Sequence, residues 1–271
     1  MFEVLVYHKI HNVINFERQI VFLKKKYTIL NLDKFKENIR RNDDYNKPSL
    51  LLTFDDGDIS FYKNAFPILK KHNVPAVIFV ITDLINTNKP FWWDAIPYYN
   101  IDVDASKLVW DVKKVPNYRR IEILQELKNK SGKKDLEYPQ LTYNQLEEMG
   151  KSGISIANHS HTHPIFDQCS NQELRYEMEF SIKVLKERNH YYDVFAYPNG
   201  NFSLESEEII RDSGIKFAFL FDHKMKKNPI NPLRISRLMV DDTTSLWKFK
   251  FILSGLHSKI LPLRKKVAKW L

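Results

Sequence analysis

The sequence of 271 residues has little or nothing of several features that mark particular classes of protein. It contains one cysteine, Cys169, which excludes an internal disulfide and a metal site built on paired thiolates. It contains no apolar run of roughly 18 residues, so we expect no membrane-spanning helix. It also shows no internal repeat and no low-complexity tract, and its length suits one large α/β domain.

The first residues lack the basic stretch, apolar core and cleavage site of a signal peptide, and they resemble a first strand instead. We therefore expect a protein that is cytoplasmic or attached to the cytoplasmic face of the membrane. The net charge of +9 would allow nucleic acid binding, but the sequence has no finger, helix-turn-helix or RNP-like signature. Nucleic acid is therefore not an expected partner.

Acidic residues are missing from the end of the chain. Residues 245–271 contain seven Lys or Arg and no Asp or Glu, and apolar side chains such as Trp247 and Phe249 alternate with the basic ones. A tail of this kind can make peripheral contact with an anionic membrane surface. The alternative, which we favour, is a final helix packed on the domain with a solvated basic face.

What the chain does contain is a regular alternation of strands and helices. Strands are expected at Val4–His8, Tyr27–Leu30, Ser49–Phe54, Pro75–Ile81, Ile154–Ala157, Val194–Tyr197, Lys216–Phe221 and Arg234–Val240. Helices are expected at Asn15–Lys26, Leu32–Arg41, Phe61–His72, Arg119–Lys130, Thr142–Met149, Asn171–Arg188 and Glu205–Ser213. This alternation predicts parallel βα units. Seven or eight of them would close into a barrel-like α/β fold, with its chemistry at the C-terminal ends of the strands.

Two adjacent carboxylates stand where the most apolar of these strands ends. The run Ser49–Phe54 is followed directly by Asp55, Asp56 and Gly57. Side chains alternate along a strand, so the two acids should point in different directions, and one could bind a metal while the other handles a proton. Two ionised acids beside an apolar strand also need a positive charge nearby. Taken alone, the segment could equally be a solvated turn.

A histidine cluster follows another expected strand, Ile154–Ala157. His159, His161 and His163 lie within five positions, and this spacing lets two imidazoles converge on one cation. Two imidazoles and one carboxylate leave coordination positions for water, as in catalytic zinc sites. The bound ion would supply the positive charge that the acid pair needs.

The segments 53–57 (Thr-Phe-Asp-Asp-Gly) and 159–164 (His-Ser-His-Thr-His-Pro) resemble the first two motifs of the polysaccharide deacetylase family, also called the NodB-homology or carbohydrate esterase 4 family. Residues 195–200 (Phe-Ala-Tyr-Pro-Asn-Gly) represent its third motif. The resemblance implies a distorted (β/α) barrel of the NodB type. It also implies hydrolytic removal of N-acetyl groups from a sugar polymer or oligosaccharide precursor, with one divalent ion. Zn²⁺ is the first choice for that ion, with Co²⁺ or Ni²⁺ as alternatives.

The resemblance also assigns roles to individual residues of this sequence. It makes Asp55 the general base. The implied metal ligands are Asp56, His159 and His163. The implied oxyanion and substrate-binding positions are Tyr197, Pro198 and Asn199. His161 falls on a variable position of the motif, so we assign it to the rim of the site and not to the metal.

Two functional residues of the family pattern are missing at their usual places, so other residues must take their roles. Ala196 stands where the third motif commonly has an arginine that orients the base, and Arg237 is our candidate for that guanidinium. The last family motif carries a histidine as general acid, and His257 in the basic tail matches it poorly. We prefer His8 for this role, because the first strand of a closed barrel lies beside the last and His8 resembles the strand-end histidine of deacetylases with a permuted motif order.

These expectations divide the chain into a catalytic domain over residues 1–244, with an irregular insertion or long crossover at about 86–140, and a basic amphipathic tail over 245–271. Two other functions stay open at this point. One is a glycan-binding protein of the same fold with impaired catalysis. The other is a binuclear amidohydrolase or phosphoesterase barrel, which would hold two ions per chain where a deacetylase holds one.

Overall fold

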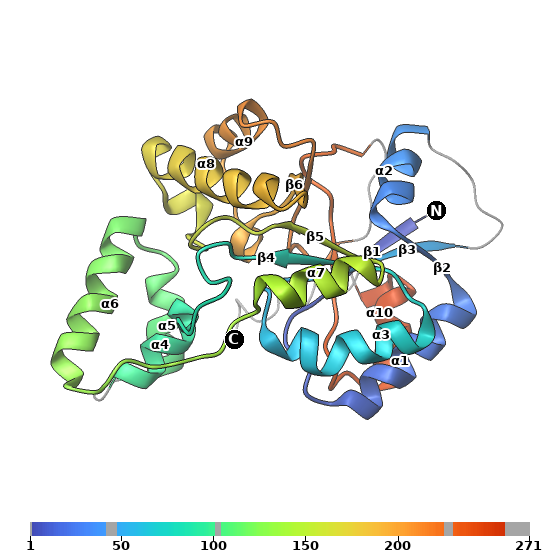
Figure 1. Cartoon of the computed structure of the whole chain (residues 1–271), viewed down its shortest axis with the longest axis horizontal. Helices are drawn as coiled ribbons and strands as arrows, with labels where there is room; N and C mark the ends of the chain where they lie inside the picture. The colour runs from blue at the N-terminus through green and yellow to red at the C-terminus, as the bar shows by residue number, and fades with distance from the viewer. Residues whose placement is uncertain (1, 42–47, 101–103, 225–229, 258–271) are drawn as a thin grey trace, which may run out of the picture.

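The computed structural model describes residues 2–41, 48–100, 104–224 and 230–257 (Figure 1). Over these residues, parallel strands form one 8-stranded sheet in the order β7-β6-β5-β4-β3-β1-β8, and β2 pairs with β3 beside this path. The strands are β1 (Phe2–Tyr7), β2 (Thr28–Leu30), β3 (Ser49–Phe54), β4 (Ala76–Val80), β5 (Ile154–Asn158), β6 (Tyr191–Ala196), β7 (Phe217–Phe219) and β8 (Leu238–Met239). The predicted parallel α/β architecture is therefore confirmed.

The sheet curves until its two ends meet. Leu238 and Met239 of β8 pair with β1, and three residues earlier Ile235 forms a parallel bridge with Phe219 of β7. One strand was expected over Arg234–Val240, but the segment changes neighbours along its length and keeps a regular ladder only at 238–239. This change of partner closes the ring and gives the distorted barrel.

Alternate residues of each central strand face the two sides of the sheet. Leu50, Leu52 and Phe54 of β3 belong to one buried cluster, which also holds apolar residues of the surrounding helices. Leu51 of the same strand belongs to a second cluster, made largely of strand residues. Every residue of β3 is buried, as is typical of a parallel strand covered on both faces.

Helices cover the outside of the barrel (Figure 1). They are α1 (Val13–Lys26), α2 (Leu32–Arg41), η1 (Phe61–Ala65), α3 (Phe66–His72), α4 (Trp92–Tyr99), α5 (Ala105–Val112), α6 (Asn117–Ser131), α7 (Tyr143–Lys151), η2 (Phe166–Gln168), α8 (Asn171–Glu187), η3 (Pro198–Gly200), α9 (Leu204–Asp212) and α10 (Leu246–Leu253). The helix expected at 61–72 opens with the π-helical turn η1, because Pro67 at the start of α3 has no N–H for a regular bond to the preceding turn.

The segment between 86 and 133, which the sequence predicts to be irregular apart from one helix, contains three. Helices α4, α5 and α6 pack around a cluster built on Trp92, Ile96 and Val112, and they lie together at one side of the barrel (Figure 1). Pro97 inside α4 and the eight-residue lengths of α4 and α5 hide this regularity in the sequence. The assignment of this region as an insertion stays a prediction.

The start of the basic tail packs against the barrel. Phe249, Ile252 and Leu253 of α10 are buried, and the Phe249 ring meets that of Phe22 on α1. The packed final helix that we favoured is therefore present over residues 246–253, while residues 258–271 lie outside the described part. None of the described helices is both long and apolar enough to cross a membrane.

Candidate active site and metal centre

Asp55 forms a buried, two-pronged ion pair with Arg237. Its position continues the alternation of Leu51 and Thr53, so its side chain enters the barrel. Nη1 and Nη2 of Arg237 donate to the two Asp55 carboxylate oxygens, each at 2.7 Å, and Nε donates to the Leu220 carbonyl at 2.7 Å. Burial raises the pKa of Asp55, but the charge and hydrogen bonds of Arg237 together with the charges of His159 and His8 outweigh it, so the pKa lies below its usual range and the carboxyl is ionised.

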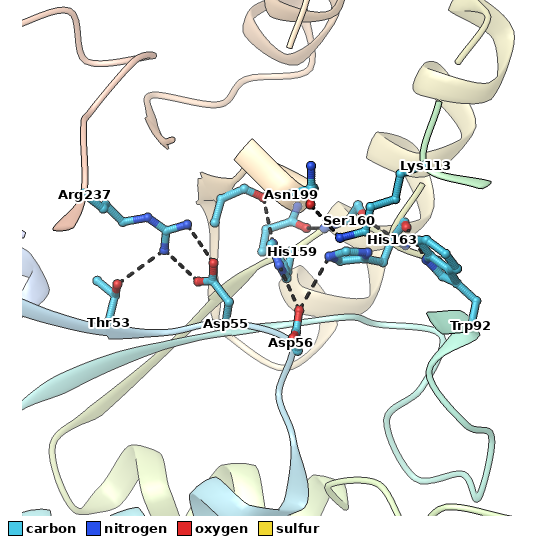
Figure 2. A network of polar contacts seen from close by, with 12 residues as sticks. Thr53, Asp55, Asp56, Trp92, Lys113, His159, Ser160, His163, Asn199 and Arg237 are labelled. Carbon is cyan, nitrogen blue, oxygen red and sulfur yellow. Dashed lines mark hydrogen bonds and ion pairs between the residues drawn. The ribbon is translucent and has the colours of Figure 1, made fainter. Parts of the chain in front are cut away.

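Asp56 points to the other side, toward two imidazoles (Figure 2). Its backbone has a φ of 71°, which turns the chain as it leaves β3. Its Oδ1 lies 3.4 Å from His159 Nε2 and 3.5 Å from His163 Nε2. Gly57 continues the turn with a φ of 69°, where a Cβ would approach Val80 Cγ1 to 3.1 Å. The two neighbouring acids therefore serve separate partners, as the strand alternation predicts.

The histidine loop is held from within and from helix α8. The Ser160 hydroxyl accepts the backbone N–H of His163 at 3.0 Å. Glu177, buried in the face of α8, accepts the backbone N–H groups of His161 and Thr162, each at 2.8 Å. A carboxylate that accepts several bonds fixes the loop firmly, because such charge-assisted bonds are stronger than neutral ones. The backbone of the loop that carries His159 and His163 is thus held in place.

The donor set fits a divalent cation. Nδ1 of His159 donates to the Ala196 carbonyl at 2.8 Å, so in the neutral ring Nε2 is an acceptor that faces an acceptor oxygen of Asp56. Two acceptors this close repel each other unless a cation lies between them. Nδ1 of His163 is buried without a hydrogen-bond partner. The ligand atoms of Asp56, His159 and His163 lie within 4.8 Å of one another, and no other such group occurs in the described ranges. Two imidazoles and a carboxylate suit zinc.

The pKa values of the two imidazoles differ. Burial lowers the pKa of His163 to about 3, and the nearby His159 adds to this, so the ring is neutral and able to bind a metal. Burial also lowers the pKa of His159, but the charges of Asp55 and Asp56 outweigh it, so the net shift is upward. The raised pKa of His159 means that the two acids stabilise a positive charge at this position, as a bound cation would provide.

A cavity opens above these groups. It is lined by His8, Asp55, Asp56, Trp93, Lys113, His159, His163, Asn199 and Phe221. His8 packs edge-on against Phe221 with ring centres 5.3 Å apart. His257 lies against Phe251 and is not among the lining residues. Of the two candidates for the general acid, the structure thus places only His8 at the cavity.

The turn of the third motif contributes one side chain to the cavity. Asn199 lines it with a φ of 57°. Tyr197, expected at the site with it, packs into the core beside Phe195 and Phe202, because its ring continues the apolar side of β6. Pro198 is also buried and is not among the lining residues. Tyr197 and Pro198 therefore shape the turn instead of lining the cavity.

The rim contains residues that the sequence analysis placed differently or missed. His161 lies outside the cavity, stacked on Phe180, as expected of a variable position. Lys113 and Trp93 line the cavity although both come from the segment expected to be irregular. The sequence could have indicated Glu177, because an acid within the buried stripe of α8, one turn from Leu174, needs a polar partner. It could not have indicated Lys113, because the contact between the end of α5 and the turn at 198–200 joins distant parts of the chain.

The comparisons with known proteins agree with this geometry. Residues 42–218 match the family described as "Polysaccharide deacetylase". Curated relatives include the poly-beta-1,6-N-acetyl-D-glucosamine N-deacetylases of Staphylococcus aureus, 23% identical over 239 residues, and of Staphylococcus epidermidis, 24% identical over 241. Each match covers 84% of this chain and 66% of the relative, so the chain spans about two thirds of their length.

Solved structures share the fold. The Streptococcus pyogenes deacetylase PplD in complex with acetate superposes with a TM-score of 0.69 and 21% identity, over 93% of this chain and 97% of that one. IcaB from Ammonifex degensii gives a TM-score of 0.64 and 20% identity, over 88% and 91%. The (β/α) barrel predicted from the sequence is thereby confirmed.

Two short motifs indicated the family, and the match now extends over 65% of the chain (177 of 271 residues, from the bounds 42 and 218). The match includes the acid pair, the histidine loop and the turn that together surround the cavity. The chain therefore belongs to the polysaccharide deacetylase family.

Proposed function

We propose that this protein is a metal-dependent hydrolase that removes acetyl groups from the amino groups of an N-acetylated glycan. The observation that supports this best is the convergence of Asp56, His159 and His163 beside the Asp55–Arg237 pair in one cavity. The separation of the two neighbouring acids gives one carboxylate for a metal and one for a proton.

The residues of the cavity fit the steps of amide hydrolysis. A divalent ion held by Asp56, His159 and His163, most simply Zn²⁺, would polarise the acetyl carbonyl and lower the pKa of a water molecule. Asp55 takes the proton of the attacking water, since a carboxylate that receives two guanidinium bonds still has free lone pairs. Arg237 keeps Asp55 ionised and oriented.

The later steps concern the oxyanion and the leaving amine. The backbone N–H of Asn199 is the proposed donor to the developing oxyanion, because this turn lies at the cavity wall. The sugar amine must gain a proton to leave. His8 is the proposed acid, since it lines the same cavity.

The names of the relatives support a proposal for the substrate class. Their printed names specify poly-beta-1,6-N-acetyl-D-glucosamine. We propose a β-1,6-linked N-acetylglucosamine polymer or its oligosaccharide precursor for this chain. Acetate release should be measured on β-1,6-linked oligosaccharides, on β-1,4-linked ones of equal length and on O-acetylated sugars. A chelator should abolish release, and Zn²⁺, Co²⁺ or Ni²⁺ should restore it. Hydrolysis that survives complete metal removal would contradict the proposal.

Replacement of a metal ligand should abolish metal binding. His159→Ala removes one of three ligands, and we expect zinc affinity to fall by at least about 100-fold, more than the loss of a supporting residue costs. Zinc content after dialysis and competition with a chromogenic chelator measures this. The matched control is His161→Ala, two residues away and outside the cavity, which should keep one ion per chain. Equal zinc binding by both variants would refute the ligand assignment.

The general acid can also be identified by comparing a variant with a matched control. His8→Ala should lower the rate of amide hydrolysis on the order of 10²–10⁴-fold, because proton transfer to the leaving amine is lost. The effect on an ester substrate should be smaller, since an alkoxide leaves with less help. His257→Ala is the control and should keep nearly full activity, because this ring does not line the cavity. The opposite pattern would move the role to the tail.

A glycan-binding protein with impaired catalysis is the second candidate. Ala196 in the third motif and the missing final motif were the features that favoured it. The guanidinium of Arg237 contacts Asp55 through two hydrogen bonds, which weakens the argument from Ala196. Tight oligosaccharide binding by zinc-loaded protein without acetate release would favour this candidate. A binuclear barrel needs two groups of metal ligands. Within the described ranges the structure contains a single group, Asp56, His159 and His163, which argues against this alternative.

Contact of the basic tail with an anionic membrane surface remains a proposal. Trp247 on α10 is 72% exposed beside Lys248 and Lys250, which is typical of a surface-binding helix. Cosedimentation with vesicles that contain anionic lipid would test it, and binding equal to that of neutral vesicles would oppose it. The cytoplasmic location expected from the sequence also stays a prediction, for cell fractionation to check.

A further inference from the structure

One wall of the cavity comes from helix α5, outside the barrel strands. Lys113 caps the C-terminal end of α5 and is half-buried at the cavity. Its ammonium donates to Asn199 Oδ1 at 2.9 Å and also lies 4.8 Å from the centre of the Trp110 ring (Figure 2 shows the Lys113–Asn199 contact). Lys113 therefore connects the turn of the third motif to an indole beside the mouth of the cavity.

The large apolar ring of Trp110 faces solvent. Its side chain is 61% exposed, while Leu108, Val109 and Val112 of the same helix pack into the cluster with α4 and α6. An exposed indole next to a polar cavity offers a ligand a flat apolar face that has little conformational freedom to lose. The proposed chemistry gives Trp110 no other task.

Neither acid of the site needs the positive charge of Lys113, so this side chain can also contact a ligand. Asp55 is already matched by Arg237 through two bonds. Asp56 is assigned to the metal. An ammonium has three N–H groups, and Asn199 accepts one of them. The other two can donate to neutral oxygens of a ligand, such as sugar hydroxyls.

We propose that Trp110 and Lys113 form a subsite for the sugar unit next to the one that loses its acetyl group. The indole stacks against the apolar face of that sugar ring, and the ammonium donates to its hydroxyl or ring oxygens. The inference rests on the proposed function, since it assigns the neighbouring sugar to a glycan chain held at this cavity. It makes helix α5 a determinant of preference for oligomers over single sugars.

The first test compares two substrates on one variant. Trp110→Ala should lower the ratio of kcat/KM for a β-1,6-linked N-acetylglucosamine pentasaccharide to that for the N-acetylglucosamine monosaccharide by about 10-fold, mainly through KM, since only the longer substrate reaches the indole. Trp110→Phe keeps a ring and should retain most of the ratio. The control is Tyr118→Ala on α6, because Tyr118 is also 61% exposed and does not line the cavity. An unchanged ratio in folded, zinc-loaded Trp110→Ala protein would overturn the subsite.

Lys113 needs a readout that separates substrate contact from support of Asn199. Lys113→Met should raise KM for the pentasaccharide more than for the monosaccharide, with a smaller change in kcat. An equal fall of kcat on both substrates would show that Lys113 acts through the turn, and would remove it from the subsite.

A binding experiment separates failure of the subsite from failure of the proposed function. Pentasaccharide affinity is measured by calorimetry on Asp55→Asn protein, with and without Trp110→Ala. An affinity about 10-fold weaker in the double variant supports the subsite even if the wild-type protein releases no acetate. Acetate release by the wild type together with equal affinity in both proteins would sustain the function and refute the subsite.

Discussion

Asp55→Asn should lower the turnover of an N-acetylated oligosaccharide on the order of 10⁴-fold, while the protein still binds one divalent ion. The amide has nearly the shape of the carboxylate but cannot accept the proton of the attacking water. Metal binding should persist because Asp56, His159 and His163 are unchanged, and because Asp56 points away from Asp55. KM should change little, since the proton transfer belongs to the transition state.

The experiment needs three measurements on the same preparation: acetate release, zinc content and thermal unfolding. Unfolding matters because the amide leaves the guanidinium of Arg237 without its counter-ion, which should lower the free energy of unfolding. Asp33→Asn on α2 is a suitable control, because its carboxylate is 60% exposed and does not line the cavity. Full turnover by zinc-loaded Asp55→Asn protein would exclude Asp55 as the base, and loss of zinc would show that the two acids do not act separately.

The sequence contained the parts of this site that depend on local pattern. Asp55 and Asp56 follow an apolar strand, His159 and His163 follow another, and parallel strands bring such ends to one edge. The opposite directions of the two acids also follow from strand alternation. These features could be predicted because neighbouring residues determine them.

The remaining parts depend on contacts between distant segments. Arg237 is 182 residues from Asp55, and the reason for its position is the change of pairing between Ile235 and Leu238, which a strand pattern cannot show. The sequence indicated Arg237 only because Ala196 stands where the third motif commonly has an arginine. Lys113 reaches Asn199 across 86 residues and no family motif marked it. Helix α5 has only eight residues, too few to give a clear helical pattern in the sequence.

Arg237→Met should destabilise the metal-free protein by about 3–5 kcal/mol at neutral pH and lower turnover on the order of 10²-fold or more. Asp55 is 3% exposed, so removal of the guanidinium leaves a buried carboxylate without a cation. The carboxylate also loses both bonds that orient it, and a small misplacement of a catalytic group is costly. Urea unfolding in the presence of a chelator measures the first effect without the contribution of bound zinc.

A double-variant cycle distinguishes an ion pair from general damage to the core. If the cost comes from the unpaired charge of Asp55, then Asp55→Asn in the Arg237→Met protein should recover a large part of it, because no buried charge remains. Arg237→Lys should be intermediate in stability, since it keeps the charge but cannot form the two-pronged contact. Additive losses in the double variant would mean that Arg237 stabilises the barrel through Leu220 and the rings of Phe79 and Phe219 instead. In that case the guanidinium would not replace the arginine that the third motif lacks.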